Sequence, residues 1–263
     1  MRTGVRTTRR RAVGDKRPVS VRSDIRHPRC AVCVLVEDPD LGELLDERRR
    51  AAAERVVIAP ELRLAAGELS WREGVEGPLL GLLVVGGLLG VRTRIPGRAH
   101  LELLGPGDVV VPWIGSADES TISNVAWYAF GRARLGVLDR GFCLSIGGLW
   151  EIHAALAERL VLRARRLAFQ LAVNALRSVD ERVLLTLWHV GDRWGRVTPD
   201  GIRLRLPLTH KDIADVVGAS RPSTTTALIK LRRDGHIQPR PGGWLLRGSP
   251  PAQLHELTTR AAA

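Results

Sequence analysis

The spacing of hydrophobic residues changes along the chain, and each change predicts a different kind of structure. Over residues 56–142, short apolar runs alternate with glycine and proline, and turns recur roughly every ten residues. This pattern predicts an antiparallel β-sandwich or roll, because so much glycine would be costly inside helices. Over residues 146–177, apolar residues instead recur at steps of three and four, which predicts one long helix.

The predicted long helix has too much apolar surface to stand alone in water between two domains. Pairing with the same helix of a second copy would bury that surface and give a homodimer. The alternative is a helix packed wholly on its own β-domain. The expected dimer contacts are the large apolar residues of the stripe: Leu149, Ile152, Leu156, Leu160 and Leu167.

Residues 208–235 carry the pattern of two short helices joined by a tight turn. Thr209 is a suitable N-cap for the first helix, and Asp212 can return a hydrogen bond as in a capping box. Gly218 ends this helix, and Ser220 caps the next. The pattern predicts a helix-turn-helix, although a helical hairpin in an unrelated domain would carry similar caps.

Strand patterns flank the two predicted helices. Residues 201–206 alternate between apolar and basic side chains, as a strand does. Residues 236–246 read as strand, Pro/Gly turn and strand, which predicts a two-stranded wing beside the helices. A further helix, over residues 181–191 with Ser178 near its start, is expected to pack beneath this module.

Basic residues concentrate at the two ends of the chain, whose net charge is +12. Residues 1–29 contain ten Lys/Arg and two Asp, and residues 203–247 contain nine Lys/Arg and three Asp. A surplus of cations on a small helix-turn-helix module is typical of phosphate binding, so double-stranded DNA is the expected partner. Residues 1–29 are too polar to form a core, and we expect a disordered arm that is either a solvated tail or a non-specific phosphate contact.

Candidate DNA-contacting residues follow from the helix-turn-helix. Short polar side chains and one Arg at the start of the second helix can meet base edges in a major groove; they are Ser220, Arg221, Ser223, Thr224 and Thr225. Donors on the first helix, the second helix and the wing are expected to contact phosphates; they are Thr209, His210, Lys211, Lys230 and Arg240.

Cysteine usage and the lack of long apolar runs predict a cytoplasmic protein. No stretch reaches the ~18 apolar residues of a membrane span, and the Arg-rich start lacks the apolar core of a secretory signal.

Cys30 and Cys33 could supply half of a metal site with His27 and Cys143, or could simply fill an apolar strand. No catalytic set of nucleophile, base and acid and no phosphate-cradling loop is evident, so we do not expect an enzyme.

The predicted elements follow one another as strands, a long helix, a short helix, a strand, a helix-turn-helix and a wing. This order resembles that of the Crp/Fnr family of bacterial transcription regulators. The most specific match covers residues 182–248, with the helix DERVLLTLWHVG, the Pro199–Gly201 turn and the segment DIADVVGASRPS. The turn from Gly105 to Asp108 resembles the GxGD corner of the family's cyclic-nucleotide-binding β-roll.

The resemblance implies an α+β fold with a β-roll sensor over residues 30–145 and a long dimerisation helix over 146–177. A winged helix-turn-helix over residues 178–250 and a tail over 251–263 complete it. It also implies a homodimer whose recognition helices enter successive major grooves, with RNA polymerase as a further partner.

Several positions depart from the family pattern. The Glu that holds a cyclic nucleotide's ribose falls near Pro112, and the segment that usually supplies the phosphate-binding Arg, residues 120–129, contains no Arg. We therefore expect weak or no binding of cyclic AMP. The family's oxygen sensors hold an iron–sulfur cluster with four cysteines, and this chain has three. His100 and His153 are candidate haem ligands, so the sequence leaves the cofactor open.

The recognition helix also departs from the family. Arg221 matches the family's base-reading Arg, but Pro222 replaces a Glu and Thr226 replaces a second Arg. The sequence thus predicts a dimeric, sequence-specific DNA-binding transcription regulator that responds to an effector other than cyclic AMP. The alternative is a constitutive or architectural DNA-binding protein whose β-roll has no ligand.

Overall fold

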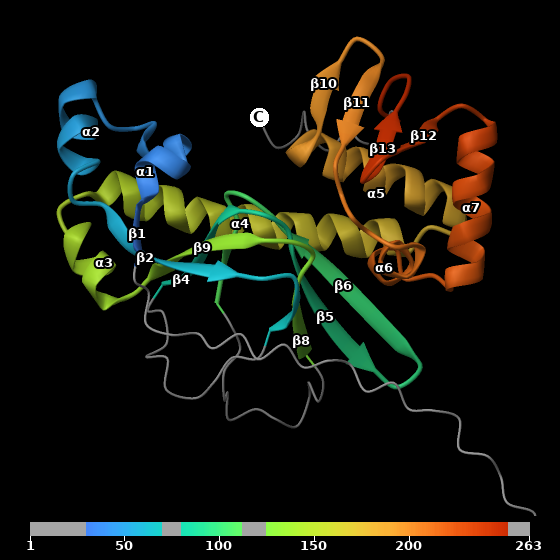
Figure 1. The fold of residues 1–263 in the computed structure, drawn as a ribbon, viewed down its shortest axis with the longest axis horizontal. Helices are drawn as coiled ribbons and strands as arrows, with labels where there is room; N and C mark the ends of the chain where they lie inside the picture. Colours follow the sequence, from blue (N-terminus) through green and yellow to red (C-terminus); the bar gives the residue numbers. More distant parts are fainter. Residues whose placement is uncertain (1–29, 70–79, 112–124, 252–263) are drawn as a thin grey trace, which may run out of the picture.

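The computed structural model describes residues 30–69, 80–111 and 125–251, and these form two lobes joined by one long helix (Figure 1). The N-terminal lobe is built on two antiparallel sheets, as the glycine-punctuated pattern predicted. The first has the order β1-β2-β9-β4-β7: β1 (Cys30–Cys33), β2 (Ile58–Leu64), β9 (Ala133–Leu138), β4 (Gly81–Gly86) and β7 (Val109–Val110). The second has the order β3-β8-β5-β6: β3 (Gly67–Leu69), β8 (Val125–Ala129), β5 (Leu89–Ile95) and β6 (Arg98–Leu104).

Short helices close one end of the first sheet. They are α1 (Val34–Glu37), the 3-10 turn η1 (Pro39–Gly42), α2 (Glu47–Ala53) and α3 (Arg140–Ser145). Strand β1 stops at Cys33, and α1 follows it directly. The charged segment that follows is split, because Asp46 accepts a hydrogen bond from the Arg49 N–H at 2.8 Å and starts a new helix there.

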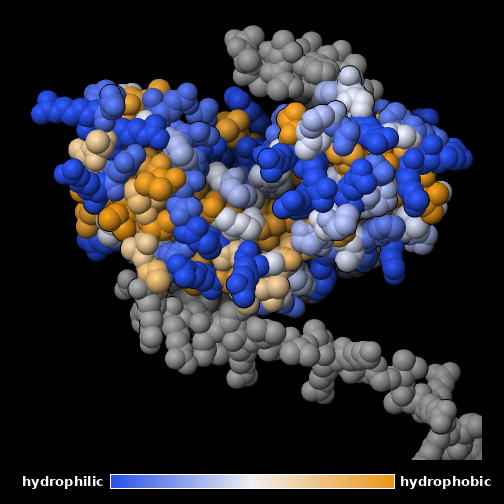
Figure 2. All heavy atoms as spheres, turned by 45° about the horizontal axis from the view of Figure 1, so that its top comes forward, coloured by the Kyte–Doolittle hydropathy of each residue, from blue (hydrophilic) through white to orange (hydrophobic). Residues whose placement is uncertain are grey.

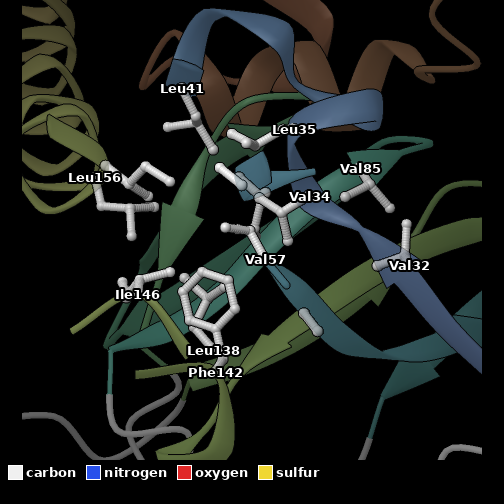
Figure 3. Close-up of a cluster of buried hydrophobic side chains, with 14 of the residues drawn as sticks. Val32, Val34, Leu35, Leu41, Val57, Val85, Leu138, Phe142, Ile146 and Leu156 are labelled. Atoms are coloured by element: carbon white, nitrogen blue, oxygen red, sulfur yellow. The ribbon is translucent and has the colours of Figure 1, made fainter. Parts of the chain in front are cut away.

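The long helix α4 (Trp150–Asn174) runs across the molecule between the sheets and the C-terminal lobe (Figure 1). Its first turns help to close a buried apolar cluster at the helical end of the N-terminal lobe (Figure 3). This cluster joins β-strand, loop and helix side chains, including Val34, Leu35, Val57, Leu138, Phe142, Ile146, Ile152 and Leu156.

Two of the predicted dimer contacts therefore lie inside the protomer. Ile152 is fully buried and Leu156 is 5% exposed within this cluster, so the prediction that they meet a second copy is wrong. Leu149 packs partly on the same cluster, and Leu167 is half-buried. Of the five predicted contacts, Leu160 alone is exposed, at 42%.

The C-terminal lobe has the predicted winged helix-turn-helix order. Its helices are α5 (Val179–Trp194), α6 (His210–Val216) and α7 (Arg221–Arg233). Its sheet has the order β10-β11-β13-β12: β10 (Arg196–Thr198), β11 (Gly201–Leu204), β13 (Gly243–Leu246) and β12 (Ile237–Arg240).

The two lobes share apolar contacts. Leu101 and Leu103 of β6 belong to the buried cluster that forms the core of the C-terminal lobe, together with Val216 of α6. Strand β6 therefore packs directly on the first helix of the helix-turn-helix. None of the helices in the described ranges is long and apolar enough to cross a membrane, and residues 1–29, predicted to form an arm, lie outside those ranges.

Candidate nucleic-acid interface

The first helix of the helix-turn-helix begins with the predicted capping box. The Thr209 hydroxyl accepts from the Asp212 N–H at 3.2 Å, and the Asp212 carboxylate accepts from the Thr209 N–H at 2.9 Å. The Thr209 hydroxyl also donates to Asp212, at 2.6 Å. Both donors of Thr209 therefore bind Asp212 in the protomer, and the contact of this exposed residue with a phosphate stays a prediction.

Side chains from α4 and α5 hold the turn between the two helices. Gly218 takes the left-handed conformation expected of it, with φ of 62°. Gln170 and Asn174 of α4 donate to the Val216 carbonyl at 3.2 and 3.3 Å. Arg182 of α5 donates to the carbonyl of residue 217 at 3.1 Å and to that of Gly218 at 3.3 Å.

These three anchoring side chains were missed by the sequence analysis. Gln170 and Asn174 are polar residues four apart near the end of a largely apolar helix, which was the one available signal. They satisfy carbonyls at the end of α6 that the helix cannot satisfy itself. The turn, and with it the start of α7, is thereby fixed to the rest of the protein.

The second helix begins as predicted, with the Ser220 hydroxyl accepting from the Ser223 N–H at 3.2 Å. Arg221 is exposed and has no carboxylate partner among the described residues. The Ser220 and Ser223 hydroxyls lie 2.8 Å apart at the same exposed helix start. A free guanidinium and two hydroxyls therefore stand where the N–H groups of the helix also point outward.

The other two predicted base contacts are placed differently. Thr224 is fully buried, so the prediction that it reads bases is wrong. Its place on the helix follows from the buried side of α7, because Ala227, Leu228 and Leu231 lie three, four and seven residues further on. Thr225 is half-buried, and its hydroxyl lies 3.1 Å from Nδ1 of His210 on the first helix.

The predicted phosphate contacts differ in how free their charges are. Lys211 is exposed but forms an ion pair with Asp215 one turn along the same helix. Lys230 pairs with Asp180 of α5 at 2.5 Å, and this hydrogen bond raises the pKa of Lys230. Arg240 lies half-buried on the wing strand β12 without a carboxylate partner in the described part of the chain. Arg240 is thus the least compensated of these three cations.

An arginine of the N-terminal lobe reaches the first helix of the helix-turn-helix. Nη2 of Arg92, on β5, donates to the Asp212 carboxylate at 2.6 Å. Its Nε lies 3.1 Å from Asp215, within ion-pair distance but without hydrogen-bond alignment. The guanidinium also lies 4.7 Å from the centre of the Tyr128 ring. Helix α6 is therefore tied to the β-roll by charge as well as by apolar packing.

The Gly105–Asp108 corner makes a second charged contact between the lobes. Gly107 has φ of 85°, and the Asp108 carboxylate accepts from the Gly105 N–H at 2.9 Å. The same carboxylate, 2% exposed, accepts from Arg166 of α4 at 2.5 Å and from Arg193 of α5 at 2.6 and 2.8 Å. The resemblance predicted the corner, but its arginine partners could not be predicted from local sequence.

A cavity of about 50 Å³ lies beside this cluster, and His100 and His189 contribute to its wall. Burial, together with the charges of Arg193 and Arg166, lowers the pKa of His189 to about 4. Burial also lowers the pKa of His100. Both imidazoles are therefore neutral at pH 7, and the positive charge beside Asp108 comes from the arginines.

Within the described ranges, the cysteines do not assemble into a ligand set with histidines or acids, and the predicted ligand His27 lies outside those ranges. Among the described residues, no group of three or more His, Cys, Asp or Glu side chains could hold a metal ion. Cys33 donates to the Glu54 carbonyl at 3.1 Å, and burial raises the pKa of the Cys143 thiol. His153 is exposed on the first turns of α4, where its ring nitrogen lies 3.1 Å from the Leu149 carbonyl.

Figure 2 shows many hydrophilic side chains over the lobe that carries α6 and α7. Comparison with known families gives a match over residues 181–255 to the Crp-like helix-turn-helix domain. This match covers the element order α5, β10, β11, α6, α7, β12 and β13 described above.

Two curated proteins are similar to longer parts of the chain. The regulatory protein CysR of Synechococcus elongatus is 32% identical over 104 residues, which are 37% of this chain and 50% of that protein. The CRP-like cAMP-activated global transcriptional regulator of Mycobacterium tuberculosis is 28% identical over 182 residues, 65% of this chain and 77% of that protein. The chain thus matches half the length of the first relative.

Solved structures share the fold. The structure of FixK2 from Bradyrhizobium japonicum superposes with a TM-score of 0.56 at 20% identity, covering 76% of this chain and 96% of that one. A CooA mutant from Carboxydothermus hydrogenoformans gives a TM-score of 0.56 at 18% identity, covering 84% and 94%. The arrangement of β-roll, long helix and winged helix-turn-helix is therefore common to these proteins.

Proposed function

Because the chain belongs to the Crp/Fnr family of DNA-binding transcription regulators, which are not enzymes, we propose that it acts as a homodimer that selects its DNA site through the start of α7. The observation that carries this proposal is Arg221, an exposed guanidinium without a carboxylate partner in the described chain, at the capped start of a helix whose turn is anchored by α4 and α5. A guanidinium can donate two parallel hydrogen bonds to guanine O6 and N7, which distinguishes this base pair from the others.

Ser220 and Ser223 support the same surface in a different way. Their hydroxyls and the free N–H groups of the first helical turn suit a phosphate or a base edge next to the one that Arg221 reads. Arg240 on the wing suits a phosphate farther along the groove. Thr224 plays no part, because it is buried in the protein.

The test begins with the DNA fragments that the purified protein selects, which give the half-site and its spacing. Arg221→Ala is then compared with Arg98→Ala, which removes an exposed arginine at the start of β6. We expect Arg221→Ala to weaken binding to the selected site by about 1–3 kcal/mol and to relax selection at one base pair. Equal losses on selected and random DNA would contradict a base-reading role.

The dimer proposal rests on a second stripe of α4. The exposed apolar residues recur alternately at four and three residues, as in the contact seam of a coiled coil. They are Trp150, Ala154, Ala157, Val161, Ala164, Ala168, Leu171 and Ala175. Trp150 and Leu171 are 66% and 71% exposed in the protomer, and the alanines between them would let a second helix approach closely.

Val161→Glu tests this seam, because it places a charge at its centre, and Val197→Glu on β10 is a matched control outside it. Sedimentation velocity should show a dimer for the wild type and for Val197→Glu, and a monomer for Val161→Glu. A Val161→Glu protein that stays dimeric with unchanged stability would contradict the proposed seam.

We also propose that cyclic AMP is not the effector and that the protein acts in the cytoplasm together with RNA polymerase. A relative is named as cAMP-activated, but residues 120–129 offer no Arg to the nucleotide phosphate. Calorimetric titration with cyclic AMP should show no saturable binding at micromolar concentration. A purified protein that binds its site fully without additives would instead favour the alternative of a constitutive DNA-binding protein.

A further inference from the structure

A cleft of about 310 Å³ opens between the β-roll and the C-terminal lobe, on the side of the Gly105–Asp108 corner. The space-filling view shows a hollow between the two lobes (Figure 2). The β-roll contributes Leu88, Phe130 and Arg132 to the cleft, and the C-terminal lobe contributes Trp194, Arg205 and Leu206. A molecule bound there would touch both lobes at once.

The base of the cleft is apolar and aromatic. Leu88, Phe130 and Trp194 are half-buried and pack on the core of the C-terminal lobe. The Trp194 indole lies directly on the β-roll corner, because a Cβ atom at Gly105 would come within 2.5 Å of the indole Cε2. The size and lining of the cleft suit the body of a small aromatic or aliphatic molecule.

The rim of the cleft is cationic. Arg132 and Arg205 are both exposed, and neither pairs with a carboxylate within the described ranges. Other arginines at or near the lobe contacts are neutralised by acidic partners, namely Arg92, Arg159, Arg163, Arg166 and Arg193. Two uncompensated guanidinium groups above an apolar base favour an organic anion over a neutral or cationic ligand.

The cleft is also in contact with the charged cluster between the lobes. The Arg193 guanidinium stacks on the Trp194 ring, with its carbon 3.9 Å from the ring centre. The same guanidinium binds Asp108, which in turn binds Arg166 of the long helix. A ligand that contacts Trp194 is therefore separated by one side chain from the ion pairs that join the lobes.

We propose that this cleft is a binding site for a small carboxylate with an aromatic or short aliphatic body, and that its occupancy changes the affinity for DNA. The carboxylate is held by Arg132 and Arg205, and the apolar body rests on Trp194 and Phe130. The regulatory half of this proposal rests on the proposed DNA-binding function, and the binding half does not.

Calorimetry on the full-length protein tests the binding half with 1-naphthoate and octanoate, and with uncharged 1-naphthylmethanol for comparison. We expect saturable binding of at least one carboxylate, weakened at least tenfold in Arg132→Ala/Arg205→Ala. The matched control is Arg55→Ala/Arg98→Ala, which removes two exposed arginines elsewhere on the N-terminal lobe that have no carboxylate partner among the residues that the structure describes. No saturable binding at millimolar concentration, or equal losses in both double variants, would overturn the site.

Tryptophan emission gives a second readout, because octanoate does not absorb at the exciting wavelength. Octanoate should change the emission of the wild type, and Trp194→Phe should abolish that change while retaining octanoate binding. An unchanged response in Trp194→Phe would place the ligand elsewhere and overturn the proposal.

The regulatory half is tested by DNA titrations with and without the bound carboxylate. We expect the dissociation constant for the selected site to change at least threefold in the wild type and not in Arg132→Ala/Arg205→Ala. Loss of all DNA binding with the calorimetric result intact would contradict the proposed function and leave the site standing. A dissociation constant for DNA that is the same with and without the bound carboxylate would refute regulation through the cleft.

Discussion

Asp108→Asn tests the charged contact between the lobes, because it removes the carboxylate charge with almost no change of shape. The amide oxygen can still accept from the Gly105 N–H, so the corner itself is retained. Arg166 and Arg193, whose side chains are 27% and 13% exposed, then face each other without a counter-charge. Breaking a buried ion pair from one side typically costs about 3–5 kcal/mol.

The lower end of this range applies here, because Arg166 is exposed enough to turn part of its charge toward water. We therefore expect Asp108→Asn to lower the free energy of unfolding by about 3 kcal/mol. For a protein of this size, each kcal/mol shifts Tm by about 2–4 °C, so Tm should fall by roughly 6–12 °C. Differential scanning calorimetry of the full-length protein at fixed protein concentration measures this shift.

Asp40→Asn is the matched control for Asp108→Asn. The Asp40 side chain is 77% exposed and its carboxylate lies 3.5 Å from Arg159, a geometry whose contribution is below about 1 kcal/mol. If Asp108→Asn melts within about 2 °C of Asp40→Asn, the cluster does not join the lobes energetically. The reasoning from burial and geometry would then be wrong.

Two further predictions concern groups beside this cluster. The pKa of His189 is lowered from 6.5 to about 4 in the folded protein, so between these pH values the unfolded chain binds a proton that the folded protein does not. The free energy of unfolding therefore falls as the pH decreases from about 6.5 toward 4, by up to about 3 kcal/mol. His189→Gln should flatten this pH dependence in urea titrations, and identical slopes for both proteins would refute the assignment. Arg92→Met leaves the buried carboxylates of Asp212 and Asp215 without their shared partner. This change should lower the free energy of unfolding by about 2–4 kcal/mol and speed amide hydrogen exchange in α6. Unchanged exchange in α6 would show that apolar packing alone holds this helix.

Features that depend on neighbouring residues in sequence were predicted correctly. The caps of Ser178, Thr209 and Ser220 formed because each hydroxyl needs only an N–H group two or three residues ahead. The wing and the left-handed Gly218 follow from equally local chemistry. The helix-turn-helix, its preceding strand and the wing could therefore be predicted from sequence, whereas strand β10 was missed.

Features that depend on which side of a helix faces the protein were predicted less well. Thr224 was assigned to DNA because its side chain is polar, although it lies three and four residues before Ala227 and Leu228 on the buried side. The helical spacing correctly predicts a buried Thr224, but its polar side chain led to the assignment to DNA. On α4, large apolar residues were assigned to a partner helix because of their size, but Ile152 and Leu156 face the protomer's own core.

The ion pairs that α4 makes with the N-terminal lobe could not have been predicted, because their partners are far apart in sequence. Arg159, Arg163 and Arg166 pair with Asp38, Glu102 and Asp108, which lie 58 to 121 positions earlier. The sequence shows only a helix with three arginines at steps of four and three. Such a pattern is equally typical of a solvent-exposed face.

The polar face of α4 explains how the position of the recognition helix is set. Arg159, Arg163 and Arg166 bind the N-terminal lobe, and Gln170 and Asn174, next on the same face, bind the end of α6. The proposed dimer seam occupies a different face of the same helix. A rotation of either lobe about α4 must therefore break charged or buried hydrogen bonds before it changes the distance between the two recognition helices of a dimer. For the proposed dimer, two half-sites one DNA turn apart would demand a separation of about 34 Å between the recognition helices. We therefore expect an effector to act through the contacts along α4 or the ion pairs of Asp108 beside it.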